Sequence, residues 1–214
     1  MRSLFKNVWF KCITALLLIA AVSGGLLSVL NDVLFVSAEE RTDRAIIKIY
    51  GELKQYDVEY DAAEGGAETI DYGYGRIDKV FTVDNGADYL FKTTGYRGYK
   101  EGTITLWVRV SVYYAEPYGE PQDGEGCERY SIEKVVLESY EKQTLMSKLG
   151  GEYYGKFRLS DVTAEYKAGR LFSATDEDKN YNAVSGATFS ATAGNNAVNC
   201  VLKYLSDKET ANED

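Results

Sequence analysis

The sequence contains no histidine, only two prolines and only three cysteines among 214 residues. Without histidine the chain cannot form imidazole zinc sites, Ser-His-Asp triads or Cys-His catalytic pairs. The three scattered cysteines, Cys12, Cys127 and Cys200, are too few for a cysteine metal cluster or a disulfide scaffold. The scarcity of proline, together with 20 glycines and 18 tyrosines, indicates a folded domain with strands rather than a disordered chain.

Basic residues are also fewer than acidic ones. The chain has 24 basic and 33 acidic side chains, a net charge of −9 and an isoelectric point near 4.8. A protein that binds nucleic acid needs a basic face that displaces counterions from the phosphates. The sequence therefore predicts no nucleic-acid partner.

Charged residues are absent from a long segment near the N-terminus. Arg2, Lys6 and Lys11 make the first eleven residues basic, and the next charged residue is Asp32. As an α-helix, the apolar residues 12–31 would span roughly 30 Å, the thickness of the hydrocarbon core of a bilayer. Because a basic flank stays in the cytoplasm, we predict a cytoplasmic N-terminus (residues 1–11), a single transmembrane anchor in the cell membrane (residues 12–36) and a main domain outside the cytoplasm.

A cleaved secretory signal peptide is the alternative for this segment. Such a peptide also begins with basic residues, and the small residues at 36–38 (Val-Ser-Ala) resemble a cleavage site. The apolar region, however, is longer than the usual 7–15 residues of a signal peptide. An anchor in contact with membrane lipid is therefore favoured, while removal of the segment stays open.

Residues 37–205 are long enough to form one domain with its own core. The clearest strand is expected at residues 103–114, where apolar residues occupy every second position. Residues 132–140 predict the next strand, antiparallel to the first across a loop at 116–127 that holds both prolines. Shorter strands are expected at 76–84 and 87–93, and the acidic, glycine-rich residues 59–75 predict a loop.

The C-terminal part predicts a helix. Within residues 190–205, Val198, Val201, Leu202 and Leu205 follow the i, i+3, i+4, i+7 spacing of one apolar helix face. Cys200 lies outside that face, and residues 206–214 predict a frayed polar tail. Strands followed by helices indicate an α+β domain in which helices flank an antiparallel sheet.

A segment of small residues, 182–192 (NAVSGATFSAT), leads into this helix. Gly186 permits a close backbone approach, and Ser185, Thr188 and Ser190 supply hydroxyl groups. Unpaired N–H groups and the positive end of the helix dipole favour an anion such as phosphate at this kind of junction. An ordinary N-cap formed by serine or threonine is the simpler alternative.

The run Ser185-Gly186-Ala187-Thr188, followed by Ser190 and a helix that contains alanine and valine, resembles the covalent flavin-attachment motif of the FMN-binding domain family. This family includes flavin-carrying subunits of the Rnf ion-translocating electron-transport complex and of the sodium-pumping NADH:quinone reductase. The resemblance implies that Thr188 carries FMN through a phosphoester bond that a dedicated flavin transferase installs. It also implies an electron-transfer subunit of an oxidoreductase complex, partnered by the other membrane subunits.

Two positions depart from the family pattern. Asn182 stands where the family usually has an aspartate, a residue associated with the modification. Residues 140–150 replace a His-x-Glu-Thr-Pro-Gly-Leu-Gly-like segment and lack its histidine and proline. By analogy with that segment, Tyr140 and Thr144 are candidate contacts of the flavin. These departures indicate a divergent member that serves a different partner.

Two other functions stay open at this stage. One is a stand-alone surface flavoprotein that passes electrons to an acceptor outside the cell. The other is a surface binding module without flavin, in which residues 185–188 only cap a helix. The state of the cysteines is also open, because Cys127 and Cys200 either pair outside the cell or stay free, with Cys12 free in or near the membrane.

Overall fold

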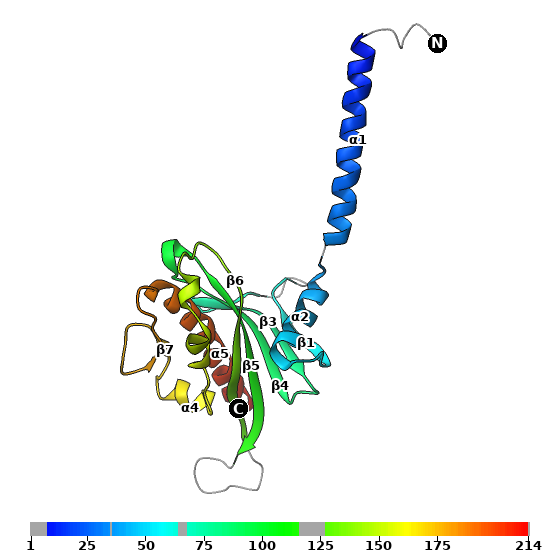
Figure 1. Cartoon of the computed structure of the whole chain (residues 1–214). Coiled ribbons are helices and arrows are strands. Elements are labelled where there is room, and N and C mark those ends of the chain that lie inside the picture. Colours follow the sequence, from blue (N-terminus) through cyan, green and yellow to red (C-terminus); the bar gives the residue numbers. More distant parts are fainter. Residues whose placement is uncertain (1–7, 35, 64–67, 116–126, 214) are drawn as a thin grey trace. The chain divides into compact units, whose positions relative to one another are not determined.

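The computed structural model describes residues 8–34, 36–63, 68–115 and 127–213 (Figure 1). The chain forms two compact units, Met1–Arg44 and Ala45–Asp214. The first unit contains helix α1 (Val8–Leu34), in which Lys11–Leu30 is long and apolar enough to cross a membrane. The predicted apolar helix is therefore confirmed. Most of the loop predicted at 116–127 lies outside the described residues.

Helix α2 (Ala38–Tyr50) begins in the first unit and ends in the second. The Ser37 hydroxyl accepts a 3.0 Å hydrogen bond from the N–H of Glu40, which is the usual role of a serine N-cap. Glu39 and Glu40 in the first turn and Lys48 in the last turn match the helix dipole.

An antiparallel sheet with strand order β1-β3-β4-β5-β6 forms the centre of the second unit, and the short β2 also pairs with β3. The predicted α+β class and the antiparallel pairing of β5 with β6 are both confirmed, with a register that runs from Ile104↔Tyr140 to Ala115↔Cys127. The strands are β1 (Tyr56–Asp61), β2 (Ile70–Asp71), β3 (Gly75–Val83), β4 (Asp88–Gly95), β5 (Ile104–Ala115) and β6 (Cys127–Tyr140).

The loop predicted at residues 59–75 is wrong in part. This stretch contains the end of β1 and all of β2, which pair with β3 through their backbones. Its acidic and glycine-rich composition did not indicate strands, because ladder hydrogen bonds depend on the neighbouring strand rather than on side chains. Residues 64–67 within it lie outside the described residues.

Short elements connect the sheet to the last helix. The Asp161 side chain caps α4 and accepts a 2.9 Å hydrogen bond from the N–H of Ala164. The remaining elements are two 3₁₀ turns (Tyr99–Glu101 and Met146–Lys148), α3 (Gly151–Gly155), α4 (Val162–Lys167), and a parallel pair of short strands, β7 (Phe172–Ser173) and β8 (Asn180–Tyr181).

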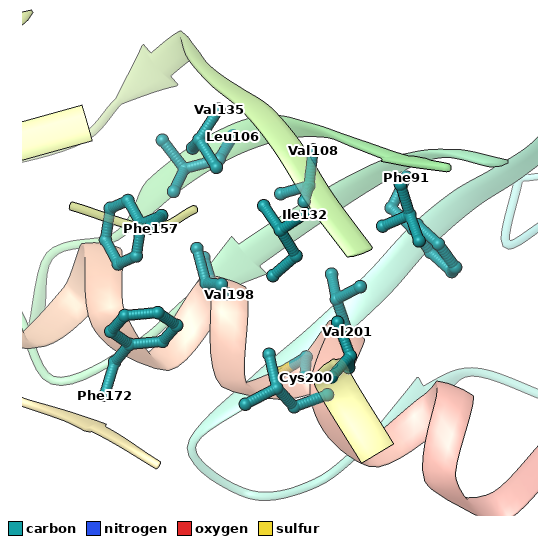
Figure 2. Packing of buried hydrophobic residues seen from close by; sticks show 14 of the residues in the cluster. Phe91, Leu106, Val108, Ile132, Val135, Phe157, Phe172, Val198, Cys200 and Val201 are labelled. Atoms are coloured by element: carbon teal, nitrogen blue, oxygen red, sulfur yellow. The ribbon is translucent and has the colours of Figure 1, made fainter. Parts of the chain in front are cut away.

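Helix α5 (Thr188–Glu213) packs on one face of the sheet and forms the main core (Figure 2). Val198 and Val201 are fully buried in the same cluster as Leu106 and Val108 of β5. The predicted apolar face of this helix is confirmed, because Leu202 and Leu205 are also fully buried.

The expectation that Cys200 lies outside the apolar face is wrong, since its side chain is fully buried. The reason is a pair of glycines on adjacent strands, Gly75 and Gly95, which let α5 approach the sheet closely. A Cβ on Gly75 would lie 2.7 Å from Sγ of Cys200, and one on Gly95 would lie 1.9 Å from the carbonyl oxygen of Ala193. Cys200 is a free thiol, so it does not pair with Cys127, whose side chain is outside the described part of the chain.

The predicted frayed tail at 206–214 is also wrong over most of its length. Helix α5 continues to Glu213, and Ser206 and Glu209 are buried. Both residues follow Leu202 at helical spacing (i+4 and i+7), so they extend the core-facing side of the helix. An Oε1 atom of Glu209 lies 3.4 Å from Nη1 of Arg129 on β6. Glu209 thus belongs to the core, because the buried Arg129 is the ion-pair partner of its carboxylate.

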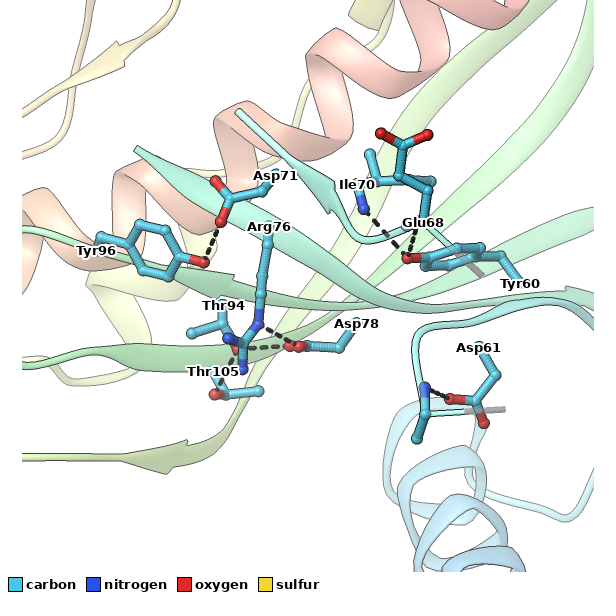
Figure 3. Close-up of polar contacts among 11 residues, drawn as sticks. Tyr60, Asp61, Glu68, Ile70, Asp71, Arg76, Asp78, Thr94, Tyr96 and Thr105 are labelled. Carbon is cyan, nitrogen blue, oxygen red and sulfur yellow. Dashed lines mark hydrogen bonds and ion pairs between the residues drawn. The ribbon is translucent and has the colours of Figure 1, made fainter. Parts of the chain in front are cut away.

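The opposite face of the sheet carries a smaller apolar cluster, where Ile46 and Ile49 of α2 pack with Leu90 and Trp107. The two-residue alternation of β4 and β5 places Thr94 and Thr105 on this face as well. There the Thr94 hydroxyl donates to the Asp78 carboxylate and lies 2.9 Å from the Thr105 hydroxyl (Figure 3).

Candidate functional site

Residues 185–188 form a tight turn that leads directly into α5. The N–H of Ala187 donates a 2.9 Å hydrogen bond to the carbonyl oxygen of Val184. Gly186 has a φ of +73°, in the left-handed region that glycine adopts without strain. A Cβ on Gly186 would also lie 2.6 Å from Nζ of Lys148. The turn therefore favours glycine, and the lysine occupies the space that a side chain would need.

Thr188 is the first residue of α5, two residues earlier than the predicted start of the helix. The N–H of Ala191 donates to the carbonyl oxygen of Ala187 at 2.9 Å, which closes the first turn of the helix. The N–H groups before it have no intrahelical acceptor and lie at the positive end of the dipole. The turn and the helix start thus form the junction of a small-residue loop and a helix that the sequence predicted.

Two of the predicted hydroxyl groups point to solvent. Ser185 and Thr188 are exposed, and within the described residues neither side chain forms a hydrogen bond. The residue before the helix is Ala187, which has no side-chain acceptor for the N–H groups of the first turn. A serine or threonine cap is therefore not what holds this end of α5, and the Thr188 hydroxyl is available for chemistry.

Ser190 has a different environment, because it is buried and faces the protein. Its hydroxyl donates a 2.8 Å hydrogen bond to Oε1 of Gln143. The same oxygen accepts from the N–H of Tyr99 at 3.2 Å, and Nε2 of Gln143 donates to the carbonyl oxygen of Glu141 at 3.1 Å. Ser190 thus anchors the first turn of α5 rather than facing solvent with Thr188.

The segment at 140–150 contacts residues 185–190, but through other residues than predicted. Tyr140 ends β6 and is half exposed, and Thr144 is exposed. The hydrogen bonds between this segment and residues 185–190 involve Gln143, which accepts from Ser190, and Lys148, which donates to Ser185. The sequence did not single out either residue. The one signal that it offers for them is their position in the segment at 140–150.

Lys148 brings positive charge to the turn. Its Nζ lies 3.5 Å from the carbonyl oxygen of Ser185. Beside this contact is a cavity of about 370 Å³ to which Lys156 also contributes. Its lining consists of Lys148, Gly150, Gly151, Glu152, Tyr153, Lys156, Ala183, Val184 and Ser185.

The buried Tyr153 contacts the first turns of α5. The Tyr153 hydroxyl lies 2.9 Å from the carbonyl oxygen of Ala191 and 3.1 Å from Oδ1 of Asn195. Burial raises the pKa of Tyr153 well above its usual value, so the hydroxyl remains a neutral donor. A Cβ on Gly194 would lie 2.3 Å from this hydroxyl oxygen, which fixes how closely α3 and α5 approach.

Asn182, three residues before Ser185, is almost fully buried. Its Nδ2 lies 3.4 Å from the carbonyl oxygen of Tyr153, and its own carbonyl oxygen accepts from Nδ2 of Asn195 at 2.9 Å. Its Oδ1 has no hydrogen-bond partner among the described residues. An ionised aspartate would place an unpaired charge in this core, so the neutral amide suits the site.

No family model, curated protein or solved structure that we compared with this chain matches it.

Proposed function

We propose that the chain is a membrane-anchored electron carrier with FMN attached to Thr188 through a phosphoester. In this proposal α1 spans the cell membrane with its basic flank in the cytoplasm, and the main domain lies outside. The carrier takes the place of a flavin-carrying subunit in an Rnf-type ion-translocating complex and exchanges electrons with the other membrane subunits.

The observation that carries the proposal is the state of the Thr188 hydroxyl. It is exposed at the first residue of a 26-residue helix and, among the described residues, forms no hydrogen bond. A left-handed glycine precedes it by two residues, and a lysine ammonium group lies against that glycine. These features suit a residue that is joined to a phosphate group: the hydroxyl is accessible and positive charge is close by.

Attachment requires an activated flavin nucleotide, because an alcohol does not displace water from a phosphate readily. The Thr188 oxygen would attack the flavin-side phosphorus of a flavin dinucleotide bound to the flavin transferase. A P–O bond forms to Thr188 as the pyrophosphate P–O bond breaks. The other nucleotide leaves as its monophosphate, the hydroxyl proton passes to solvent, and no electrons are transferred.

The attached flavin would supply the redox chemistry, and the protein would supply position and charge. A covalent bond suits a carrier outside the cytoplasm, because a flavin that dissociated there would be lost. The part of the chain after the anchor, residues 39–214, has 21 basic and 32 acidic side chains. This acidic domain is repelled by anionic lipid, which leaves the site accessible to partners.

A stand-alone surface flavoprotein is the second candidate. It is favoured by the segment at 140–150, where Gln143 and Lys148 hold the motif in place of the family's histidine- and proline-containing stretch. A different segment beside the flavin indicates a different partner. The third alternative, a binding module without flavin, is less well supported, because Thr188 and Ser185 do not cap the helix in the described structure.

Covalent flavin is tested on protein purified from its native cell. We expect yellow fluorescence that persists on a denaturing gel and a flavin phosphate mass on the peptide that contains Thr188. Thr188→Val should abolish both signals, whereas the matched control Thr175→Val, at an exposed threonine outside the motif and the cavity, should retain them. Unmodified native Thr188, or fluorescence that survives Thr188→Val, contradicts the proposal. Genes for the other Rnf membrane subunits beside this one would favour the complex over the stand-alone protein.

A further inference from the structure

We propose that Lys148 is the phosphate-binding residue of this site, and that the cavity it lines with Lys156 recognises a flavin by its phosphate group. The inference rests on the proposed function for the identity of the ligand. It assigns a role to two lysines that the flavin-attachment motif does not contain.

The Lys148 ammonium group lies beside the turn at residues 185–188. Nζ lies against Gly186, close enough that a Cβ on this glycine would be only 2.6 Å away, and 3.5 Å from the carbonyl oxygen of Ser185. An ammonium group has three donors. Within the described residues, the long contact to Ser185 is the one hydrogen bond of this group, so its other two donors have no protein acceptor there.

The cavity beside Lys148 carries a net positive charge. Its ionisable lining residues are Lys148, Lys156 and Glu152, along with the neutral Tyr153, so positive charge is in excess. This differs from the chain as a whole, in which acidic residues outnumber basic ones by 33 to 24. A local excess of positive charge on an acidic protein attracts anions to that point.

The cavity has the size of a small-molecule site and a partly apolar lining. Its volume of about 370 Å³ falls within the range of small-molecule sites, roughly 300–1,000 Å³. Ala183 and Val184 contribute apolar side chains beside the lysines. Such a site suits a ligand with one anionic end and an uncharged remainder, as in a flavin mononucleotide, better than a small inorganic ion alone.

The two lysines have different roles in this proposal. Lys148 contacts the turn that precedes Thr188 and binds the phosphate directly, whereas Lys156 adds attraction from elsewhere in the cavity lining. Lys148 is a compact point charge rather than a planar fork, so it can follow the phosphate while the phosphoester forms. Lys148 is therefore a binding and positioning residue.

The experiment compares FMN with riboflavin, which lacks only the phosphate. It uses the full chain carrying Thr188→Val, which cannot be modified, and measures flavin fluorescence at low salt. We expect FMN to bind about tenfold more tightly than riboflavin, as one charge-assisted contact would give. Adding Lys148→Gln should remove this preference and leave riboflavin binding unchanged. Lys156→Gln should reduce the preference by a smaller factor, and Lys142→Gln, an exposed lysine outside the cavity, should not change it.

Several outcomes would overturn the inference: equal affinity for FMN and riboflavin, no binding of either, or a preference that survives Lys148→Gln. Inorganic phosphate should compete with FMN in the protein with Lys148 intact, which checks the site without any variant that could misfold. The proposed function fails separately, if Thr188 of the native protein carries no flavin while the Lys148-dependent preference persists. Conversely, full modification of Thr188 together with unchanged binding by the Lys148→Gln protein rejects only the role of Lys148.

Discussion

The side-chain oxygen of Gln143 accepts a 2.8 Å hydrogen bond from the hydroxyl of Ser190, and both residues are buried. This contact joins the segment after β6 to the first turn of α5. The same Gln143 oxygen accepts from the N–H of Tyr99, so one amide connects three segments that are distant in the sequence. The position of the Thr188 turn therefore depends on a residue outside the motif.

Replacing Gln143 by alanine should lower the free energy of unfolding by about 1–3 kcal/mol, because the buried hydroxyl of Ser190 and the N–H of Tyr99 lose their acceptor. Ser190→Ala should lower the free energy of unfolding by less, and the double variant should lower it by less than the sum of the two single substitutions. Urea unfolding measures these values. Gln55→Ala, at an exposed position, is the control and should have little effect. Additive effects of the two substitutions would show that the hydrogen bond contributes nothing.

Gly95→Ala should destabilise the domain by about 3 kcal/mol, because an added methyl group in a packed interior forces the backbone apart. Its Cβ would lie 1.9 Å from the carbonyl oxygen of Ala193 and 2.5 Å from the backbone nitrogen of Ala197. The control is Gly155→Ala in α3, where nothing lies within 4 Å of the added Cβ. Thermal unfolding compares the two, and equal melting temperatures would mean that α5 does not approach the sheet as described.

Ending the chain after Leu205 should destabilise it by about 3 kcal/mol or more, because Arg129 loses the carboxylate of a buried ion pair. A chain that ends after Thr210 keeps Glu209 and should retain most of its stability. Denaturant unfolding of the two truncated proteins distinguishes them. If both are as stable as the full chain, the last two turns of α5 do not belong to the core.

Stability should depend on pH through Glu165. Hydrogen bonds from Arg170, at 2.8 Å and 2.6 Å, lower the pKa of Glu165 below its ordinary value of 4.5. A lowered folded-state pKa means that the contribution is present above about pH 4.5 and is lost as the pH falls below it. The pair is partly exposed, so we expect about 1 kcal/mol or less.

The measurement is the difference in unfolding free energy between about pH 7 and a pH below about 4.5, where this contribution is being lost. Glu165→Gln should make this difference smaller than in the unaltered protein, whereas Glu177→Gln, at an exposed position, should leave it unchanged. A Glu165→Gln protein with the full pH dependence would refute the assignment.

Cys200 should resist alkylation in the folded protein. Burial raises the pKa of its thiol far above the ordinary value, and the reactive form is the thiolate. Iodoacetamide followed by peptide mass spectrometry should therefore modify Cys200 only in urea. An engineered Ser147→Cys, at an exposed position, should react without urea and shows that the reagent is active. Rapid modification of Cys200 in the folded state would contradict its burial.

Features that depend on neighbouring residues in the chain were predictable. The uninterrupted apolar composition of residues 12–31 predicted α1, and the two-residue alternation at 103–114 with the turn residues after it predicted the β5–β6 pair. The spacing of Val198, Val201, Leu202 and Leu205 likewise predicted the buried side of α5. Each of these signals is a period or a composition, and local geometry converts it directly into structure.

Features that depend on distant partners were not predictable. Cys200 is buried because Gly75 and Gly95 admit the helix, and Glu209 is buried because Arg129 pairs with it. At the candidate site the amino-acid order alone pointed to Thr188 and its turn, but the tertiary contacts selected Gln143 and Lys148 and placed Ser190 in the interior. Such contacts arise only when remote segments pack together, and no local pattern encodes which side chains will meet.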